Sequence, residues 1–327
     1  MSTAEIPEVT VRLNASYHLH SIHRMVNSLR PIYDLESPTI VRLDLEDLSF
    51  ISPANLAYMV AVMRRGRENG TVADGSVIVN PAKPRVRTYL HRMDVLRVLF
   101  EKEPNDPTDP IDRQDVAGLK ECVHFASEPG GRKVAGDLAK ATQEEVETDT
   151  FAAASLELAL IELTENVHFH ADAEFGGFAA AQTFKNSKEI EVAIVDLGVG
   201  ISQSLSQNPE YEESAADDVG AIKEALKPLV TANPERNRGY GLAFTRFLLE
   251  YNDGRLIVWS GNGWVQVGEE YVEKEKDFMP GTLVVLRLHT DRPFDFQHAY
   301  GKLTEAIEEI EGATDDDVRE LRNETGR

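Results

Sequence analysis

The sequence predicts a mixed α/β protein built from two domains. Stretches that alternate apolar and polar residues, as strands do, are separated by stretches whose apolar residues recur at helical spacing. The length of 327 residues is sufficient for two domains with a core each. Pro104, Pro107 and Pro110 stand among acidic residues and indicate a linker. The charge divides near the same place: residues 1–100 carry 12 basic and 10 acidic side chains, and the remainder carries 22 and 46.

The first domain, residues 1–104, is expected to be a small α/β layer. Strands are predicted where short β-rich runs end at turns, and helices where apolar residues follow a 3.6-residue period. In chain order we predict a strand at 9–13, a helix at 21–29, a strand at 39–45, a helix at 56–67, a strand at 75–80 and a helix that begins at Pro84. Strands that alternate with helices are typical of α/β folds.

A linker at 105–124 is expected to lead to a second α/β domain at 125–292 and an acidic helical tail at 293–327. In chain order we predict a helix at 151–171, a buried strand within 189–201 that runs into a glycine-rich turn, a polar irregular stretch at 203–238, a helix at 241–249, and strands at 255–260 and 281–288.

The formal net charge of −22 and the pI near 4.8 argue against two kinds of partner. Nucleic acids and anionic membranes both attract proteins that carry an excess of Lys and Arg over Asp and Glu. Neither part of this chain carries a large excess of that kind. Cys122 is the single cysteine, so neither an intrachain disulfide nor a cysteine zinc cluster is expected. The N-terminal segment lacks the apolar core of a secretory signal, and no stretch has the length and apolarity of a membrane span, so we expect a cytoplasmic protein.

Polar residues recur every four positions on the helix predicted at 151–171. Glu162, Asn166 and His170 therefore share one face, beside an apolar stripe that faces the core. A carboxylate one turn before an amide can hold a water with one group and a divalent cation with the other. A solvated helix face would show the same spacing, so this motif alone leaves both interpretations open.

Two glycine-rich turns lie at the ends of predicted elements. The first, Asp196-Leu197-Gly198-Val199-Gly200, follows a buried strand, where a carboxylate can accept a hydrogen bond from an exocyclic amine and glycines let a flat base approach. The second, Arg238-Gly239-Tyr240-Gly241-Leu242, opens a helix, whose N-terminal amides attract phosphate. The polar segment at 228–237 before it could form a lid. Ordinary turns and helix caps would also account for each motif taken singly.

In this order the motifs resemble those of the GHKL (Bergerat-fold) ATP-binding family, which includes gyrase-type ATPases, histidine kinases and anti-sigma serine kinases. Glu-x-x-x-Asn lies on a helix, Asp-x-Gly-x-Gly follows a strand, Gly-x-Gly-Leu enters a helix, and Gly281-Thr282 opens a strand. The resemblance covers roughly residues 125–290. It implies a Bergerat-type α/β sandwich that binds ATP and Mg²⁺.

The resemblance also implies a role for each matching residue. Glu162 would orient or deprotonate the attacking nucleophile, and Asn166 would ligate Mg²⁺. Asp196 would bind the adenine amino group. The residues that would shape or support the nucleotide pocket around these three are Gly198, Gly200, Gly239, Tyr240, Gly241, Leu242 and Thr282, with Arg236 and Arg238 as further candidate phosphate ligands. The chain departs from the family pattern in having one candidate lid without a second glycine cluster, and in having His168 and His170 where many kinases have a cation.

The first domain resembles a STAS domain, the small fold of anti-sigma-factor antagonists, over roughly residues 8–100. The similar segments are 40–45, 50–56, 64–67, 77–81 and 86–90. The family's signature places a phosphorylatable serine before a glycine at the start of a helix, and Ala54-Asn55 stands there instead. Because alanine has no hydroxyl, the usual phospho-switch is not expected, and Ser52 is not given that role. Other small α/β domains share this alternation of elements.

Three functions follow from these resemblances. The first is an ATP-binding regulatory protein that couples nucleotide state to a protein partner through the STAS-like domain, and the second is an anti-sigma-type serine/threonine kinase with Glu162 as the base. The third is a histidine-kinase relative, which is disfavoured because no suitable phosphoacceptor histidine precedes the ATP domain; His18, His20 and His23 also lack a carboxylate at metal-site spacing. A homodimer is an expectation by analogy with relatives.

The charge division also predicts how the domains meet. The near-neutral first domain presents arginines that could bind an acidic partner or the acidic second domain; these are Arg64, Arg65, Arg67, Arg85 and Arg87. We therefore expect a polar contact between the domains that weakens in salt.

Overall fold

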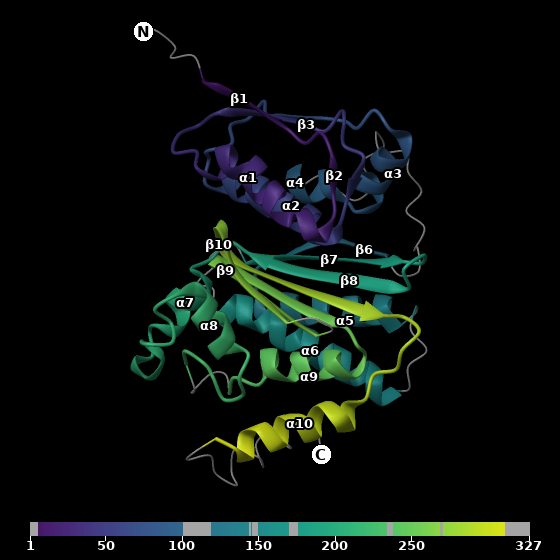
Figure 1. Ribbon diagram of the computed structural model, residues 1–327. Helices are drawn as coiled ribbons and strands as arrows, with labels where there is room; N and C mark the ends of the chain where they lie inside the picture. Colours follow the sequence, from purple (N-terminus) through teal and green to yellow (C-terminus); the bar gives the residue numbers. More distant parts are fainter. Residues whose placement is uncertain are drawn as a thin grey trace.

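The mixed α/β class is confirmed in a computed structural model, which describes residues 6–100, 119–143, 145, 150–169, 176–233, 238–268 and 271–310. Figure 1 shows the elements stacked in layers: a small sheet, a layer of helices, a second sheet, a second layer of helices and a final helix. The first two layers belong to an N-terminal domain at residues 6–100, and the remaining layers to a C-terminal domain at residues 119–310.

The N-terminal domain is built on a three-stranded parallel sheet with the order β1-β3-β5, beside a two-stranded pair formed by β2 and β4. Parallel neighbours need crossover connections, and helices supply them here. The elements are β1 (Glu8–Arg12), β2 (Ser16–Tyr17), the 3₁₀ turn η1 (Leu19–Ser21), α1 (Ile22–Tyr33), β3 (Ile40–Asp44), β4 (Phe50–Ile51), α2 (Pro53–Glu68), β5 (Val77–Val79), α3 (Pro84–Arg92) and α4 (Val95–Phe100).

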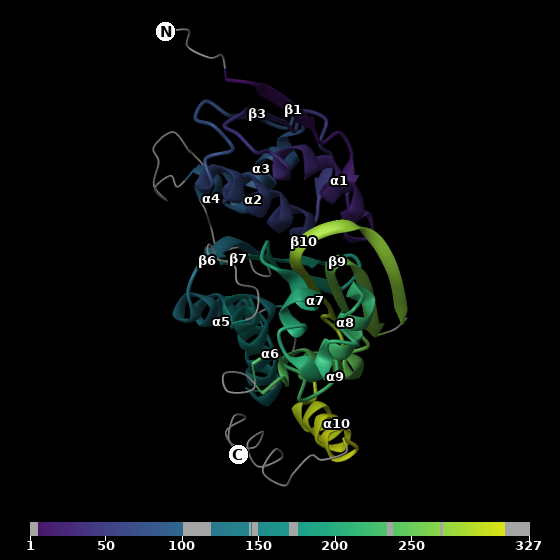
Figure 2. The ribbon, with the colours of Figure 1, turned by 90° about the vertical axis from the view of Figure 1, so that its left-hand side faces the viewer.

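The C-terminal domain is built on a five-stranded antiparallel sheet with the order β6-β7-β8-β10-β9. Helices α5, α6 and α9 cover one face of it, and α10 packs on α9 (Figures 1 and 2). The elements are β6 (Leu119–Phe125), α5 (Glu128–Gln143), α6 (Thr150–Phe169), β7 (Gly177–Phe184), β8 (Glu189–Asp196), α7 (Gly200–Leu205), the 3₁₀ turn η2 (Pro209–Tyr211), α8 (Asp218–Ala225), α9 (Gly241–Tyr251), β9 (Arg255–Gly268), β10 (Val272–His289) and α10 (Phe296–Glu308).

The other face of the five-stranded sheet is covered by the N-terminal domain. Helix α2 is buried along its first eleven residues, Pro53 to Met63, because it lies between the two sheets and packs on β7 and β8. A helix that is apolar on every side is expected to be buried in this way. One apolar cluster joins the two domains and includes Leu56 of α2 and Phe178, Ala193 and Trp259 of the large sheet.

A buried polar contact lies within this apolar interface, at the first turn of α2. The Ala54 amide, in the first turn of α2, donates a 2.9 Å hydrogen bond to Glu191 Oε1 of β8. Glu191 is fully buried and is paired with Arg287 of β10, whose Nη2 lies 2.7 Å from Glu191 Oε2. The Ser52 side chain forms no cap for α2. Glu191 therefore supplies the hydrogen-bond acceptor that the Ala54 amide lacks within its own domain.

The structure therefore corrects the expectation, drawn from the charge division, of a polar and salt-sensitive contact between the domains. The domains meet through apolar surface, because the face of a sheet that helices do not cover must be buried against another element. The front arginines have partners inside their own domain: Arg64 pairs with Glu68, Arg67 lies 3.9 Å from Asp74, and Arg65 stacks over the Tyr33 ring. Arg85 and Arg87 are exposed on α3.

Three expected boundaries also differ from the structure. The end of the predicted linker at 105–124 is strand, because β6 begins at Leu119 and pairs with β7; residues 105–118 lie outside the described part. The stretch expected to be irregular contains α7, η2 and α8. The start of the predicted tail is part of the domain core, because Ala299, Leu303 and Ile307 of α10 are buried; residues 311–327 lie outside the described part.

Among the described residues, none of the helices combines the length and the apolar character needed to cross a membrane.

Candidate functional site

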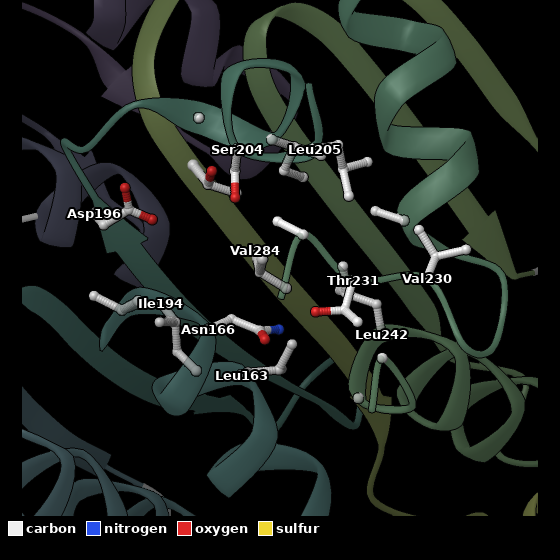
Figure 3. A pocket seen from close by; sticks show the side chains of 18 residues that line it. Leu163, Asn166, Ile194, Asp196, Ser204, Leu205, Val230, Thr231, Leu242 and Val284 are labelled. Carbon is white, nitrogen blue, oxygen red and sulfur yellow. The ribbon is translucent and has the colours of Figure 1, made fainter. Parts of the chain in front are cut away.

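A cavity, partly open to solvent, lies between the large sheet and helices α6, α7 and α9. The predicted site residues that line it are Asn166, Asp196, Gly200, Gly239, Gly241, Leu242 and Thr282. Figure 3 shows the Asn166 amide at the cavity, with Asp196 to one side of it and Leu242 and Thr231 to the other.

Asp196 forms the polar end of this cavity. It is the last residue of β8 and is 4% exposed, and its Oδ1 accepts a 2.8 Å hydrogen bond from the Gly198 amide. Burial raises the pKa of Asp196 to about 7, although hydrogen bonds from the Gly198 and Thr282 amides act in the opposite direction. A carboxyl group with this pKa, in a cavity with apolar walls, is a candidate for recognising a ligand.

The turn after Asp196 depends on its glycines and on a serine from a distant strand. Gly200 has a φ of +80°, and a Cβ there would lie 2.8 Å from Ser260 Oγ of β9. The Ser260 hydroxyl accepts a hydrogen bond from the Ile201 amide and donates one to the Gly281 carbonyl, both at 2.9 Å. Ser260 therefore fixes the start of α7 to β10 at the rim of the cavity. No sequence motif marked it, because it stands at the end of an ordinary strand pattern.

The opposite end of the cavity is formed by the start of α9 beside α6. Gly241 is the first residue of α9, and a Cβ there would lie 2.7 Å from Glu162 Cβ and 3.0 Å from Glu162 Oε2. Glu162 thus lies against the N-terminus of α9, one turn of α6 before Asn166. Gly239 has a φ of +75°, and its missing side chain lets the backbone at Val230 pass close to it. The free amides of a helix N-terminus attract anions.

Four predicted residues do not line the cavity. Glu162 stands beside it against α9, and Gly198 lies in the turn after Asp196, where its amide bonds the Asp196 carboxylate. Tyr240 is buried in the core of the C-terminal domain, and Arg238 is exposed. His168 is exposed in the last turn of α6, whereas His170 and Arg236 lie outside the described residues.

The remaining walls were not marked by any motif. Val230, Thr231 and Ala232, from the segment predicted as a lid, line the cavity, as do apolar side chains such as Leu163, Ile194, Leu205 and Val284. Apolar residues of this kind fill every core, so the sequence carries no signal that separates pocket walls from ordinary packing.

The side chains around the cavity limit how it could hold a metal ion. The described residues contain no group of three or more His, Cys, Asp or Glu side chains placed to hold an ion. Asn166 lines the cavity between its two ends and offers an amide oxygen. Mg²⁺ commonly takes one or two protein oxygens and completes its shell with water and substrate phosphates, and this cavity fits that arrangement better than a metal site made of protein alone.

Comparison of the chain with protein-family models gives no match, and comparison with curated proteins gives none either. What the cavity binds is therefore inferred from its geometry.

Proposed function

We propose that the protein binds ATP·Mg²⁺ in this cavity and is a regulatory protein whose nucleotide state alters a contact with a protein partner. The observation that carries the proposal is the cavity itself, which has a buried carboxylate at one end, a helix N-terminus at the other and apolar walls between them. A nucleotide has the matching order of groups: an amino-bearing base, a sugar and phosphates. The resemblance to the GHKL family supports the same ligand.

At the base end, Asp196 accepts a hydrogen bond from the adenine amino group. Ile194, Leu205 and Val284 provide apolar surface for the ring. Guanine carries a carbonyl where adenine carries its amino group, and above the Asp196 pKa the ionised carboxylate, an acceptor, would then face an acceptor. The site accordingly selects adenine nucleotides.

At the phosphate end, the amides of Gly241 and Leu242 bind phosphate oxygens at the start of α9. Asn166 supplies an oxygen to the Mg²⁺ that the phosphates bring with them. Since the chain is strongly acidic, an anionic ligand needs such local compensation, which backbone amides and a cation provide.

A serine/threonine kinase is the second candidate. Glu162 supports it, because this carboxylate lies beside the first residue of α9, where the terminal phosphate would be held. In that position it is the general base that takes a proton from a partner's hydroxyl group. Neither the histidine-kinase alternative nor a homodimer gains support from a particular contact in the described part of the chain.

Titration calorimetry with a non-hydrolysable ATP analogue and Mg²⁺ tests the binding site. Asp196→Asn should weaken binding about 10- to 150-fold, the effect of losing a hydrogen bond to a charged group. Asp253→Asn, at an exposed position of the same domain, is the matched control and should bind as the wild type does. Unchanged affinity in Asp196→Asn would overturn the pocket assignment, and equal affinity for the guanine analogue would overturn the selectivity.

Incubation with γ-labelled ATP separates the two candidate functions. Label that reaches a partner protein with the wild type, and not with Glu162→Ala, supports the kinase. Tight binding without hydrolysis or transfer supports the regulatory switch.

A further inference from the structure

We propose that the β9–β10 hairpin couples the cavity to the N-terminal domain, so that ligand binding is transmitted through one arm of this hairpin. The ligand in this proposal is ATP·Mg²⁺, so the coupling rests on the proposed function. It concerns the hairpin arm, residues 261–268 and 272–281, which lies outside the cavity.

The arm exists because the hairpin is longer than the sheet it belongs to. Pairing between β8 and β10 ends at Asp196 and Thr282, whereas pairing between β9 and β10 continues to Gln266 and Val272. Figure 2 shows β10 curving away from the sheet between α1 on one side and α7 and α8 on the other. Helix α8 packs on β9 and α1 packs on β10, so the arm touches both domains.

Toward the cavity, the arm is attached to α8 through Asp218. Asp218 Oδ2 accepts a 2.7 Å hydrogen bond from the Asn262 amide of β9. Gly261 and Gly263, on either side of Asn262, both lie so close to Asp218 that a Cβ at either position would overlap it. A 2.9 Å ion pair between Lys223 and Glu273 makes a second attachment.

Helix α8 in turn forms part of the cavity wall. Its last residue, Ala225, lines the cavity, and the chain then continues to Val230, Thr231 and Ala232, which line it as well. A ligand that draws these wall residues inward therefore pulls on α8, and through Asp218 on the arm.

Toward the N-terminal domain, the arm is attached to α1 and to the shared apolar cluster. Asn27 Nδ2 of α1 donates a 2.6 Å hydrogen bond to Asp277 Oδ2 of β10. Trp264 and Met279 of the arm are buried in the cluster that joins the domains. The Trp264 ring also packs edge-on against Trp259 of the large sheet.

Because both attachments are specific, movement of α8 cannot leave the arm and α1 unchanged. Close-packed contacts shift between discrete arrangements and do not deform continuously. While the Asp218 and Lys223 contacts hold, movement of α8 shifts the arm, and with it Asp277 against α1 and Trp264 within the shared cluster. Nucleotide binding thus changes how the N-terminal domain is held, and a change at the N-terminal domain alters nucleotide affinity by the same factor.

The test uses Asn27→Ala, which lies in the other domain from the cavity. Its nucleotide affinity, measured by calorimetry with the Mg²⁺ complex of the ATP analogue, should change by about two- to tenfold, the effect of one hydrogen bond. Asn69→Ala, an exposed asparagine of the same domain, should leave it unchanged. In an Asp218→Ala background the effect of Asn27→Ala should disappear, and Asp218→Asn, which keeps an oxygen acceptor for the Asn262 amide, should restore it.

Hydrogen–deuterium exchange without nucleotide provides an independent measurement. Asn27→Ala should increase exchange of the α8 amides relative to the wild type and Asn69→Ala. Exchange in α8 that does not respond to Asn27→Ala overturns the coupling, whether or not nucleotide binds. If the wild type binds no adenine nucleotide, but Asn27→Ala still increases exchange in α8, the proposed function is overturned and the mechanical link remains supported.

Discussion

Asp196 brings together burial and hydrogen bonding at the end of β8. The carboxyl group is removed from water, which raises its pKa to about 7, and two backbone amides oppose this rise only in part. A ligand that donates a hydrogen bond to the carboxylate favours its ionised form. Binding of such a ligand and release of the Asp196 proton are therefore linked.

The first prediction is that affinity for adenosine falls as the pH is lowered. Below about pH 7 the Asp196 carboxyl is increasingly protonated, so the fraction able to accept the adenine amino group shrinks. Calorimetry should give an affinity about tenfold weaker at pH 6 than in the plateau above pH 8, in proportion to the ionised fraction. Adenosine is used because it carries no phosphate that titrates in this range.

Asp196→Asn serves as the control for this profile. Its affinity should be weak and independent of pH from 6 to 8. A wild-type profile that is equally flat would show that ionisation of Asp196 plays no part in binding.

At the scale of single elements, α9 illustrates how one glycine allows two helices to meet. The first turn of α9 crosses α6 where Glu162 stands, and only the absence of a side chain at Gly241 permits this approach. Gly301 of α10 is also helical, but a Cβ there would have no atom within 4 Å. Replacing glycine by alanine is therefore expected to have different consequences in the two helices.

Gly241→Ala should selectively weaken binding of the phosphates. The added Cβ, 2.7 Å from Glu162 Cβ, displaces the start of α9, whose amides are proposed to bind the phosphates. We expect affinity for the ATP analogue to fall about tenfold or more, consistent with losing part of a helix N-terminal interaction, while adenosine affinity changes far less.

Gly301→Ala is the comparison variant for this experiment. It should bind both ligands normally and gain about 0.5–1 kcal/mol of stability, as expected for alanine over glycine inside a helix. If Gly241→Ala lowers the affinity for adenosine and for the ATP analogue equally, the assignment of α9 to the phosphates is wrong.

At the scale of the whole molecule, the two domains share one apolar cluster, beside which the fully buried Glu191 pairs with the partly buried Arg287. Burying two charges costs solvation free energy that their attraction and hydrogen bonds offset. The pair helps to fix the position of α2 on the sheet, because Glu191 also accepts a hydrogen bond from the Ala54 amide. The position at which the STAS resemblance would place a phosphoserine is thereby enclosed between the domains.

Arg287→Met should destabilise the protein strongly, because it leaves the Glu191 carboxylate buried without its cation. We expect a loss of about 3–5 kcal/mol in the free energy of unfolding, measured by urea denaturation. Combining it with Glu191→Gln, which removes the charge but keeps an acceptor for Ala54, should recover part of the loss.

The control for this loss is an exposed pair. Arg292→Met breaks the ion pair with Asp253 and should cost about 0–1 kcal/mol. Equal effects at Arg287 and Arg292 would contradict the assignment of Glu191 as a buried charge that needs its partner.

The apolar contact between the domains also predicts insensitivity to salt. The two tryptophans of the chain, Trp259 and Trp264, are both buried in the shared cluster. Their fluorescence emission maximum should therefore stay constant between 50 mM and 1 M NaCl, because screening weakens charge interactions and leaves apolar burial intact. A shift to longer wavelength at high salt would instead indicate a contact held mainly by charges.

The sequence predicted β3, α6 and α9 from their apolar patterns. It missed β7, which is rich in small residues, the short helix α8, and α5, although the apolar residues of α5 recur at helical spacing. Among the site residues, Asp196 and Gly241 stand in local motifs. Ser260 and Asp218 do not, because their roles depend on partners far away in the sequence.

The amino-acid sequence alone establishes the mixed α/β class and the chemistry available at the ends of β8 and α9, because periodicity and turn residues act locally. The tertiary structure decides which faces are buried against each other. Apolar burial has no direction, so an apolar α2 could cover any exposed sheet face. The large sheet, closed by α6 and α9 on one side, leaves its other face for α2, and the length of the β9–β10 hairpin then carries its arm from the cavity wall to α1.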